Sequence, residues 1–326
     1  MKLPGVLLTT FAALAALTAA ASAQDWPNRP ITLIVPFAAG GGVDTSARLQ
    51  AAMIGELLGQ TIVVENVGAA AGTVGSARVA KAAPDGYTFL MGNSGTHVYS
   101  QSLYKKKPYD STTDFEPVGL VTDSPRLLVA RNGLPVNNLQ QLIAHMKANQ
   151  DKMQYGSAGV GSGTHLPCAL FNFTLGVNIT MVPYRGEALS LQDVIGDRID
   201  YMCTTIQSGF GQVKQKTVKG IAVMAPARVA ILPDVPTAGE QGQPGVEATV
   251  WNGFFFPKGT PKAIVEKMHK AIHTVIERPD IRQKMESLGL EILSADKRTP
   301  AYLAKILPED IERWGKVIKA AGISMD

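Results

Sequence analysis

The chain has 326 residues, of which 45% are hydrophobic and 18% are charged, proportions that are typical of a globular protein. Its formal net charge of +4 is small, and basic patches with interleaved aromatic residues are absent, so we expect no nucleic-acid partner. The length suits one large domain or two ordinary ones.

The N-terminus has the pattern of a cleavable export signal. Lys2 supplies a short positive region, residues 6–17 are apolar, and Ala21-Ser22-Ala23 fits an A-x-A cleavage site. We therefore expect a signal peptide over residues 1–23, a mature chain that begins near Gln24, and a periplasmic location.

Residues 31–46 are the stretch around which we expect the chain to be organised. Ile31 to Val35 is apolar and rich in β-branched residues, which predicts a buried parallel strand. Glycines 40–42 then form a turn, and Asp44 with the two hydroxyl residues after it begins a helix. Free backbone N–H groups and the helix dipole at such a turn suit an anion, either a carboxylate or a phosphate. The alternative is a tight turn that binds nothing.

Helices and strands alternate through the first part of the chain. We expect a helix at 43–58, a strand at 61–66, a helix at 73–82 and a strand at 87–92. This order predicts a parallel sheet covered by helices. The strand-like segments 118–121 and 127–130 follow, broken by Asp123-Ser124-Pro125, and we interpret them as the first crossing between two lobes.

The alternation restarts in the middle of the chain. The expected elements are helix 138–149, strand 153–155, a helix that ends at 175, strand 179–184, helix 187–195, strand 198–204, helix 208–215 and strand 218–224. Strand 249–256 is a candidate for the return crossing, and helices follow at 261–277, 280–288 and 300–321, the last interrupted at Pro308. The predicted division is lobe 1 at 24–123, lobe 2 at 124–250, and a return to lobe 1 at 251–326.

The chain contains two cysteines, Cys168 and Cys203. In an oxidising compartment they can form a disulfide, or they can stay as two buried free thiols. The sequence leaves both possibilities open.

Motifs of enzymes are largely missing. The glycine-rich stretch 156–163 lacks the lysine of a phosphate-binding loop and the third glycine of a dinucleotide fingerprint, and no serine stands in G-x-S-x-G. His269 and His273 share a helix face but have no glutamate between them, so we expect a solvated face and no metal. His97 and His165 follow predicted strand ends, and each either donates to a ligand or packs at a helix start. We expect no catalytic residues and no cofactor.

The mature chain resembles one known family along its whole length. The motifs that carry the resemblance are Trp26-Pro27 with Arg29-Pro30-Ile31, Val35-Pro36-Phe37 with Gly40-Gly41 and Asp44, Pro84-Asp85-Gly86-Tyr87, Tyr155-Gly156-Ser157 with Gly161, Gly163 and His165-Leu166, Val182-Pro183-Tyr184-Arg185-Gly186, Leu232-Pro233-Asp234-Val235-Pro236-Thr237, and Pro257-Lys258-Gly259-Thr260-Pro261. With these motifs in order, residues 26–326 resemble the Bug-type extracytoplasmic solute-binding proteins, the receptor components of tripartite tricarboxylate transporters.

The resemblance implies an α/β fold of the type II, Venus-flytrap class. Each of its two lobes is then an open, mostly parallel sheet with helices on both faces, and two crossing strands form the hinge. It also implies a non-catalytic, monomeric receptor that delivers a small carboxylate to the membrane permease subunits of such a transporter. The acid is expected to be a di- or tricarboxylate or an aromatic carboxylate.

Candidate ligand-binding residues come from loops at the ends of predicted strands, where open parallel sheets bind ligands, and from the resemblance. They are Phe37, Ala38, Ala39, Gly40, Gly41, Asp44, Asn93, Ser94, Thr96, Ser157, Ala158, Gly161, Ser162, His165, Tyr184, Arg185, Gly186 and Thr204.

Two positions depart from the family pattern, which more often has lysine at Arg185 and often an acidic residue at Thr204. The missing carboxylate leads us to expect a purely anionic ligand. Phe37, Tyr184 and Phe254 are aromatic residues that can form an apolar wall, although for Phe254 we favour a place in the core.

Two other functions stay open on the sequence alone. An exported α/β enzyme that acts on a carboxylate or ester would use His97 or His165 as its base. A sensory receptor would present its closed form to a membrane kinase.

Overall fold

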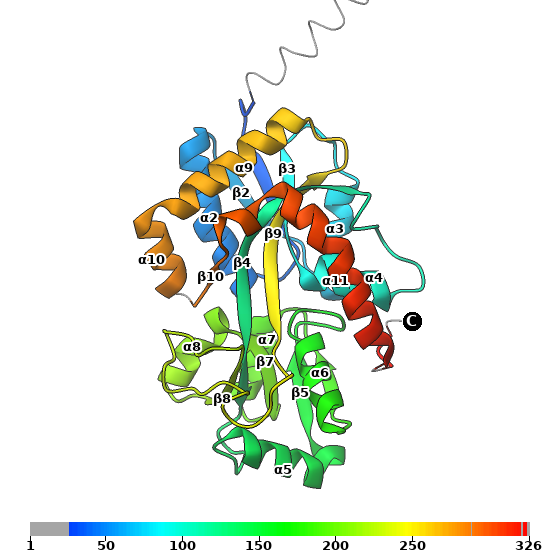
Figure 1. The fold of residues 1–326 in the computed structure, drawn as a ribbon, viewed down its shortest axis with the longest axis vertical. Coiled ribbons are helices and arrows are strands. Elements are labelled where there is room, and N and C mark those ends of the chain that lie inside the picture. The colour runs from blue at the N-terminus through cyan, green and yellow to red at the C-terminus, as the bar shows by residue number, and fades with distance from the viewer. Residues whose placement is uncertain (1–25, 288, 321, 325–326) are drawn as a thin grey trace, which may run out of the picture.

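The computed structural model describes residues 26–287, 289–320 and 322–324, and the expected signal peptide at 1–23 lies outside the described residues. The molecule has two α/β lobes joined by two long strands that run side by side (Figure 1). We call the lobe that holds the first strands of the chain lobe 1 and the other lobe 2. The strands together follow the order β2-β1-β3-β9-β4-β7-β5-β6, and β8 and β10 each pair with β4.

Lobe 1 is built on a mixed sheet. Its strands are β1 (Ile31–Val35), β2 (Ile62–Asn66), β3 (Thr88–Asn93) and β10 (Glu291–Ile292), with parts of β4 (Phe115–Ala130) and β9 (Thr249–Pro257). β1 is parallel to β2 and β3, whereas β9 is antiparallel to β3 and to β4. The buried apolar residues of β1 place it at the centre of the lobe, in accord with the expected buried strand.

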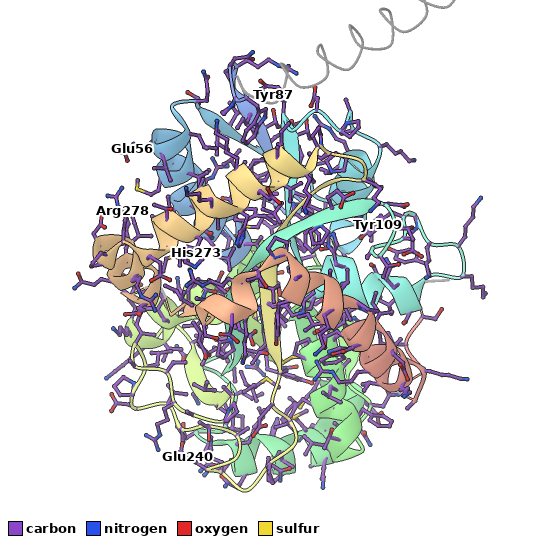
Figure 2. The ribbon with its side chains drawn as sticks, turned by 45° about the horizontal axis from the view of Figure 1, so that its top comes forward. Glu56, Tyr87, Tyr109, Glu240, His273 and Arg278 are labelled. Carbon is purple, nitrogen blue, oxygen red and sulfur yellow. A yellow bond between two sulfur atoms is a disulfide. The ribbon has the colours of Figure 1, made fainter. Side chains whose placement is uncertain are left out.

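Helices cover the sheet of lobe 1 on both faces. They are α2 (Gly42–Leu58), α3 (Thr73–Ala80), α4 (Ser100–Leu103), α9 (Lys262–Glu277), α10 (Pro279–Ser287) and α11 (Pro300–Ala320), with short helical turns at Ala70–Gly72, Gly95–Tyr99 and Ala295–Arg298. Ile264, Met268 and Ile272 recur at helical spacing on the buried side of α9. Arg278, which follows α9, lies 3.9 Å from Glu56 of α2 (Figure 2), so the C-terminal helices pack back onto the first segment.

The two crossing strands, β4 and β9, form one antiparallel ladder. It extends from the pair Phe115 with Pro257 to the pair Pro125 with Thr249. The break that we expected at 123–125 is therefore absent, because this part of β4 pairs with β9 on one side and partly with β10 on the other. Since β4 pairs with strands of both lobes, the lobe boundary placed after residue 123 stays a prediction.

Lobe 2 repeats the architecture with a second sheet. Its strands are β5 (Gln154–Ser157), β6 (Thr180–Pro183), β7 (Tyr201–Thr205) and β8 (Lys219–Met224), and its helices are α5 (Leu139–Asn149), α6 (Leu166–Leu175), α7 (Glu187–Ile195) and α8 (Ile206–Lys214), with a short turn at Gln150–Lys152. β5 is parallel to β6 and β7, and β4 is antiparallel to β7 and β8.

A disulfide joins α6 to β7 inside the core of lobe 2. Cys168 and Cys203 are fully buried, and their Cα atoms lie 5.5 Å apart. The bond closes a loop with a sequence separation of 35 residues and ties a covering helix to the sheet.

Two local predictions were wrong. Helix α11 continues through Pro308, because burial of Leu303, Leu307 and Trp314 on one face offsets the hydrogen bond that the proline removes. Residues 93–97 were expected to form a loop after strand 87–92, but Gly95–Tyr99 form a turn of π-helix that runs into α4. The expectation that Phe254 belongs to the core is confirmed, since its side chain is fully buried.

Candidate functional site

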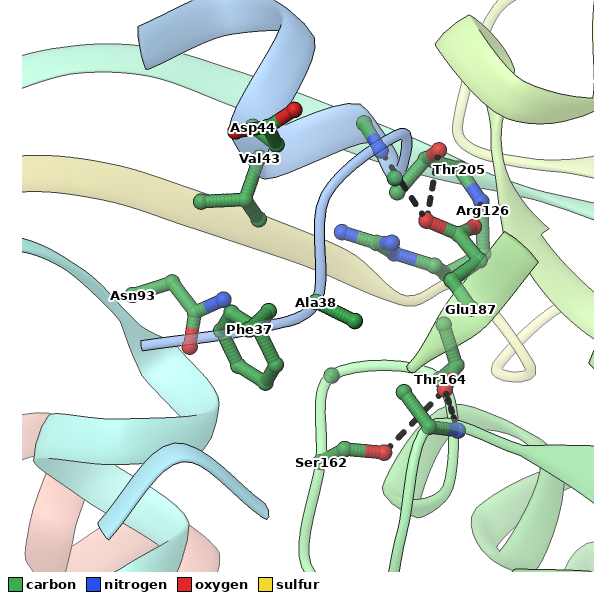
Figure 3. A pocket seen from close by; sticks show the side chains of 14 residues that line it. Phe37, Ala38, Val43, Asp44, Asn93, Arg126, Ser162, Thr164, Glu187 and Thr205 are labelled. Carbon is green, nitrogen blue, oxygen red and sulfur yellow. Dashed lines mark hydrogen bonds between the residues drawn. The ribbon is translucent and has the colours of Figure 1, made fainter. Parts of the chain in front are cut away.

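A small cavity of about 30 Å³ lies between the lobes, next to the hinge strands (Figure 3). Lobe 1 contributes the start of α2, and lobe 2 contributes the loop after β5 and the starts of α7 and α8. The lining residues are Phe37, Ala38, Gly41, Gly42, Val43, Asp44, Asn93, Arg126, Ala158, Ser162, Gly163, Thr164, Glu187 and Thr205. The glycine turn of one lobe and the Ser/Gly loop of the other therefore face the same hollow.

The side chain of Asp44 holds the glycine turn in place. Its carboxylate accepts hydrogen bonds from the N–H of Gly40 at 2.9 Å, from Asn66 at 2.9 Å, and from Arg48 at 3.1 Å. Burial works to raise the pKa of Asp44, but these hydrogen bonds outweigh it and hold the pKa below its ordinary value. Gly40 has a φ of +84°, a conformation that favours glycine.

The turn leaves two backbone donors open at the N-terminus of α2. The first N–H groups of a helix have no partner inside the helix. Among the described residues, no protein acceptor lies on the N–H groups of Val43 and Asp44, whereas the N–H of Gly42 donates to Glu187 at 3.3 Å. The positive end of the helix dipole adds to the attraction for a negative charge here.

Glu187 of α7 is a buried carboxylate that connects the lobes. Within lobe 2 it accepts hydrogen bonds from the hydroxyl of Thr204 at 2.6 Å, from the hydroxyl of Thr205 at 3.1 Å, and from the N–H of Thr205. The bond from Gly42 crosses from lobe 1. Four donors on two oxygens therefore satisfy the hydrogen-bonding capacity of this buried carboxylate.

Arg126 of β4 is a buried cation in the cavity wall that forms no salt bridge with another described residue. Its side chain is only 3% exposed, its Nε has no hydrogen-bond partner, and in the described part of the chain no carboxylate oxygen lies within 4.0 Å of it. Figure 3 shows its guanidinium pointing from β4 toward Val43 and Asn93. Burial lowers the pKa of Arg126, and the nearby Glu187 raises it. A buried arginine without an acid is costly, which points to an anion that binds in the cavity.

Asn93 presents a donor to the same space. Its Oδ1 accepts the N–H of Thr96 at 3.1 Å, and this bond fixes the orientation of the amide. The amide nitrogen, which has no protein acceptor among the described residues, therefore points into the cavity beside Phe37 (Figure 3).

The loop of lobe 2 is held by its own hydrogen bonds. Thr164 accepts the N–H of Ala158 at 2.7 Å, and its hydroxyl lies 3.1 Å from that of Ser162. The N–H of Gly161 donates to Nδ1 of His165 at 2.9 Å. The hydroxyls of Ser162 and Thr164 are thus fixed at the cavity wall.

A second, outer cavity of about 250 Å³ shares Phe37 and Ala158 with the first. Tyr184 and Arg185 also line it. The hydroxyl of Tyr184 donates to Asp193 at 2.6 Å, so the tyrosine offers mainly its ring to this space. The outer cavity therefore adjoins the inner one at Phe37 and Ala158.

The predicted site residues divide into three groups, and their contact with a ligand stays a prediction. Those that line the inner cavity are Phe37, Ala38, Gly41, Asp44, Asn93, Ala158 and Ser162, and those found only in the outer cavity are Tyr184 and Arg185. The remaining ones, Ala39, Gly40, Ser94, Thr96, Ser157, Gly161, His165, Gly186 and Thr204, line neither. Several of these hold lining residues in place, as Thr96 holds Asn93 and Thr204 holds Glu187.

The two histidines near the cleft are packing residues. His97 is fully buried, stacks on Phe255 with ring centroids 3.9 Å apart, and bonds to Thr96. Burial lowers the pKa of His97 to about 3 and that of His165 to about 4, so both are neutral at pH 7. Neither lines the cavity, which leaves no histidine base beside the candidate site.

The described residues show neither a candidate metal cluster nor a helix that could span a membrane. They contain no group of three or more histidine, cysteine or acidic side chains that could hold a metal ion, and His269 and His273 stand as a pair. None of their helices combines the length and the apolar character that crossing a membrane requires.

Sequence reasoning missed two lining residues, because Arg126 and Glu187 were not considered as site residues. The other lining residues outside the candidate list belong to strand-end loops that the sequence placed at the cleft; they are Gly42, Val43, Gly163, Thr164 and Thr205. The available signal was the single charge of Arg126 before the apolar run 127–130, because a charged residue in a buried strand calls for a partner. Glu187 looked like an ordinary acidic residue in the first turn of a helix.

Comparison with known proteins yields a consistent set of relatives. The sequence profile described as "Tripartite tricarboxylate transporter family receptor" matches residues 46–323. The chain is 39% identical to the periplasmic binding protein BugD, with a TM-score of 0.88 and coverage of 92% of this chain and 99% of that one. MatC from Rhodopseudomonas palustris with bound malate has a TM-score of 0.86 and 38% identity, covering 90% of this chain and 100% of that one. R. palustris Rpa4515 with adipate has a TM-score of 0.88 and 34% identity, covering 92% and 99%.

Proposed function

The chain belongs to the tripartite tricarboxylate transporter receptor family, and from this premise we propose that it captures a small carboxylate between its lobes in the periplasm and delivers it to the membrane permease of such a transporter. The observation that carries the proposal is the interlobe cavity. There, among the described residues, Arg126 has no carboxylate oxygen within 4.0 Å, and the N–H groups of Val43 and Asp44 at the start of α2 have no acceptor. An acid group of the ligand supplies an anion to these groups.

The relatives support the ligand class. MatC was solved with malate and Rpa4515 with adipate, both of which are dicarboxylates. The outer cavity adjoins the inner one at Phe37 and Ala158 and offers the second acid group of such a ligand a place beside Tyr184 and Arg185. We therefore place dicarboxylates first among the candidates, followed by tricarboxylates and aromatic carboxylates.

Capture requires the lobes to separate and close again. A cavity of about 30 Å³ has room for roughly two water molecules, which is less than a dicarboxylate needs. The ligand therefore binds to an opened form in which the bond between Gly42 and Glu187 is broken. Closure around the ligand then removes it from water and strengthens each charge-assisted hydrogen bond.

Isothermal titration calorimetry of the chain against di-, tri- and aromatic carboxylates tests the proposal. We expect at least one ligand with a dissociation constant in the micromolar range or below. Absence of binding across the whole panel would refute the ligand class.

Two further assays separate the alternatives. Overnight incubation with each binder, followed by NMR of the ligand, should show no turnover, since neither His97 nor His165 lines the cavity. Turnover would favour the enzyme. Capture of the permease subunits, and not of a membrane kinase, from solubilised host membranes with the liganded protein is the expected partner result.

A further inference from the structure

The cavity offers open hydrogen-bond donors to a ligand, whereas the side-chain oxygens that line it already accept hydrogen bonds from the protein. From this imbalance we propose that Arg126 anchors a ligand carboxylate and that the site selects acids that carry no ammonium group. The inference rests on the proposed function and narrows its substrate class.

Arg126 is the strongest donor in the cavity. The guanidinium carries a full charge, and its fork matches the two oxygens of a carboxylate. Its side chain is 3% exposed, and in the part of the chain that the structure describes no carboxylate lies within 4.0 Å of it. A ligand carboxylate is therefore the group that completes its ion pair.

The other open donors in the cavity also favour an anionic ligand. The amide nitrogen of Asn93 lies beside the cavity because its oxygen is occupied by the N–H of Thr96. The N–H groups of Val43 and Asp44 have no acceptor among the described residues. An oxygen-rich, acceptor-only ligand satisfies these groups together.

An ammonium group would need acceptors, and the two carboxylates that line the cavity already accept hydrogen bonds from the protein. Asp44 accepts from Gly40, Arg48 and Asn66. The carboxylate of Glu187 accepts three hydrogen bonds from Thr204 and Thr205 within lobe 2, and a fourth from Gly42 when the lobes are closed. The hydroxyl of Thr164 already accepts the N–H of Ala158. A buried ammonium would therefore lose its bonds to water without replacement, which is a large penalty.

Matched ligand pairs test the selection. Malate and L-aspartate have the same carbon skeleton and differ in a hydroxyl or an ammonium group, and glutarate with L-glutamate and adipate with L-2-aminoadipate form similar pairs. For each pair that binds, calorimetry of the whole chain should show that the amine-free acid binds at least about 100-fold more tightly than its amino partner. Equal affinity within the pairs would overturn the selection, although the protein would remain a carboxylate receptor.

Arginine variants test the anchor. Arg126→Met should weaken binding of the best amine-free acid at least about 30-fold, and Arg126→Lys, which keeps the charge but loses the fork, about 10-fold. Arg298→Met is the matched control, because Arg298 is equally buried but pairs with Glu277 and lies outside the cavity. It should lower thermal stability without changing affinity.

A second variant keeps the test informative if Arg126→Met does not fold. Asn93→Asp retains the oxygen that accepts from Thr96 and replaces only the donor nitrogen by an acceptor. Asn93→Asp should weaken binding of the amine-free acid at least about 10-fold. It should also reduce the ratio between the affinities for this acid and for the matched amino acid. Unchanged affinity in both Arg126→Lys and Asn93→Asp would overturn the anchor, whereas absence of binding by the unaltered protein to every carboxylate would overturn the proposed function itself.

Discussion

Gly42 is the position where one added methyl group should test lobe closure. A Cβ atom on Gly42 would lie 2.5 Å from the hydroxyl oxygen of Thr205 and 3.1 Å from its Cβ. Thr205 belongs to the opposite lobe and is held by Glu187 and by the N–H of Ser208, so it cannot turn away cheaply. Gly42→Ala should therefore keep the lobes slightly apart. An overpacked contact costs about 1–3 kcal/mol, which corresponds to a loss of about 5- to 150-fold in ligand affinity.

The separate lobes should not suffer from this change. Alanine is a better helix former than glycine, so the urea midpoint of Gly42→Ala should equal or exceed that of the unaltered protein. Gly41→Ala is the matched control, since its Cβ would meet Glu187 at an ordinary 3.8 Å and its φ is −83°. Calorimetry and small-angle scattering give the affinity and the compactness. If Gly42→Ala binds the ligand as tightly as the unaltered protein, or if Gly41→Ala loses as much ligand affinity as Gly42→Ala, closure does not depend on the contact between Gly42 and Thr205.

Three further predictions concern the disulfide, the two buried histidines and the carboxylate of Asp44. Replacing Cys168 and Cys203 by serine should lower the free energy of unfolding by about 2–4 kcal/mol in urea, since the bond closes a loop of 35 residues, and a reductant should change the serine variant no further. His97 and His165 have folded pKa values of about 3 and about 4, below the ordinary 6.5, so the unfolded chain binds more protons than the folded chain in mildly acidic solution. The free energy of unfolding should therefore fall by about 2 kcal/mol per histidine as the pH is lowered from 6.5 to 5. In thermal melts, His165→Asn should reduce this dependence of stability on pH. Asp44→Asn should lower the free energy of unfolding by about 1–3 kcal/mol and weaken ligand binding, because the N–H of Gly40 loses its charged acceptor. Unaltered ligand binding would mean that the glycine turn keeps its conformation without this carboxylate.

The fold was largely predictable because its signals are local. The apolar run at 31–35, the glycine after α2 and the asparagine cap of α5 each follow from a few neighbouring residues. The continuous course of β4 was not predictable, since Pro125 indicates a break unless the pairing with β9 is known. The π-helical turn at 95–99 likewise depends on tertiary packing.

The site was predictable as a set of loops but not as a set of charges. Gly41 and Ser162 belong to glycine-rich strand ends, and both line the cavity. Arg126 stands in a strand that carries no motif, and only the strand register directs it at the cavity. Glu187 is satisfied by residues 17 and 18 positions away, and no spacing rule connects them.

The ladder between β4 and β9 has a mechanical consequence. Two independent linkers would let the lobes twist and slide relative to each other. The hydrogen-bonded ribbon of β4 and β9 resists bending within its own plane and bends more easily perpendicular to that plane. The swing of the halves is thereby restricted to nearly a single axis. Under the proposed function, the membrane permease would then meet a narrow range of shapes, and a loaded molecule would differ from an empty one by one well-defined angle.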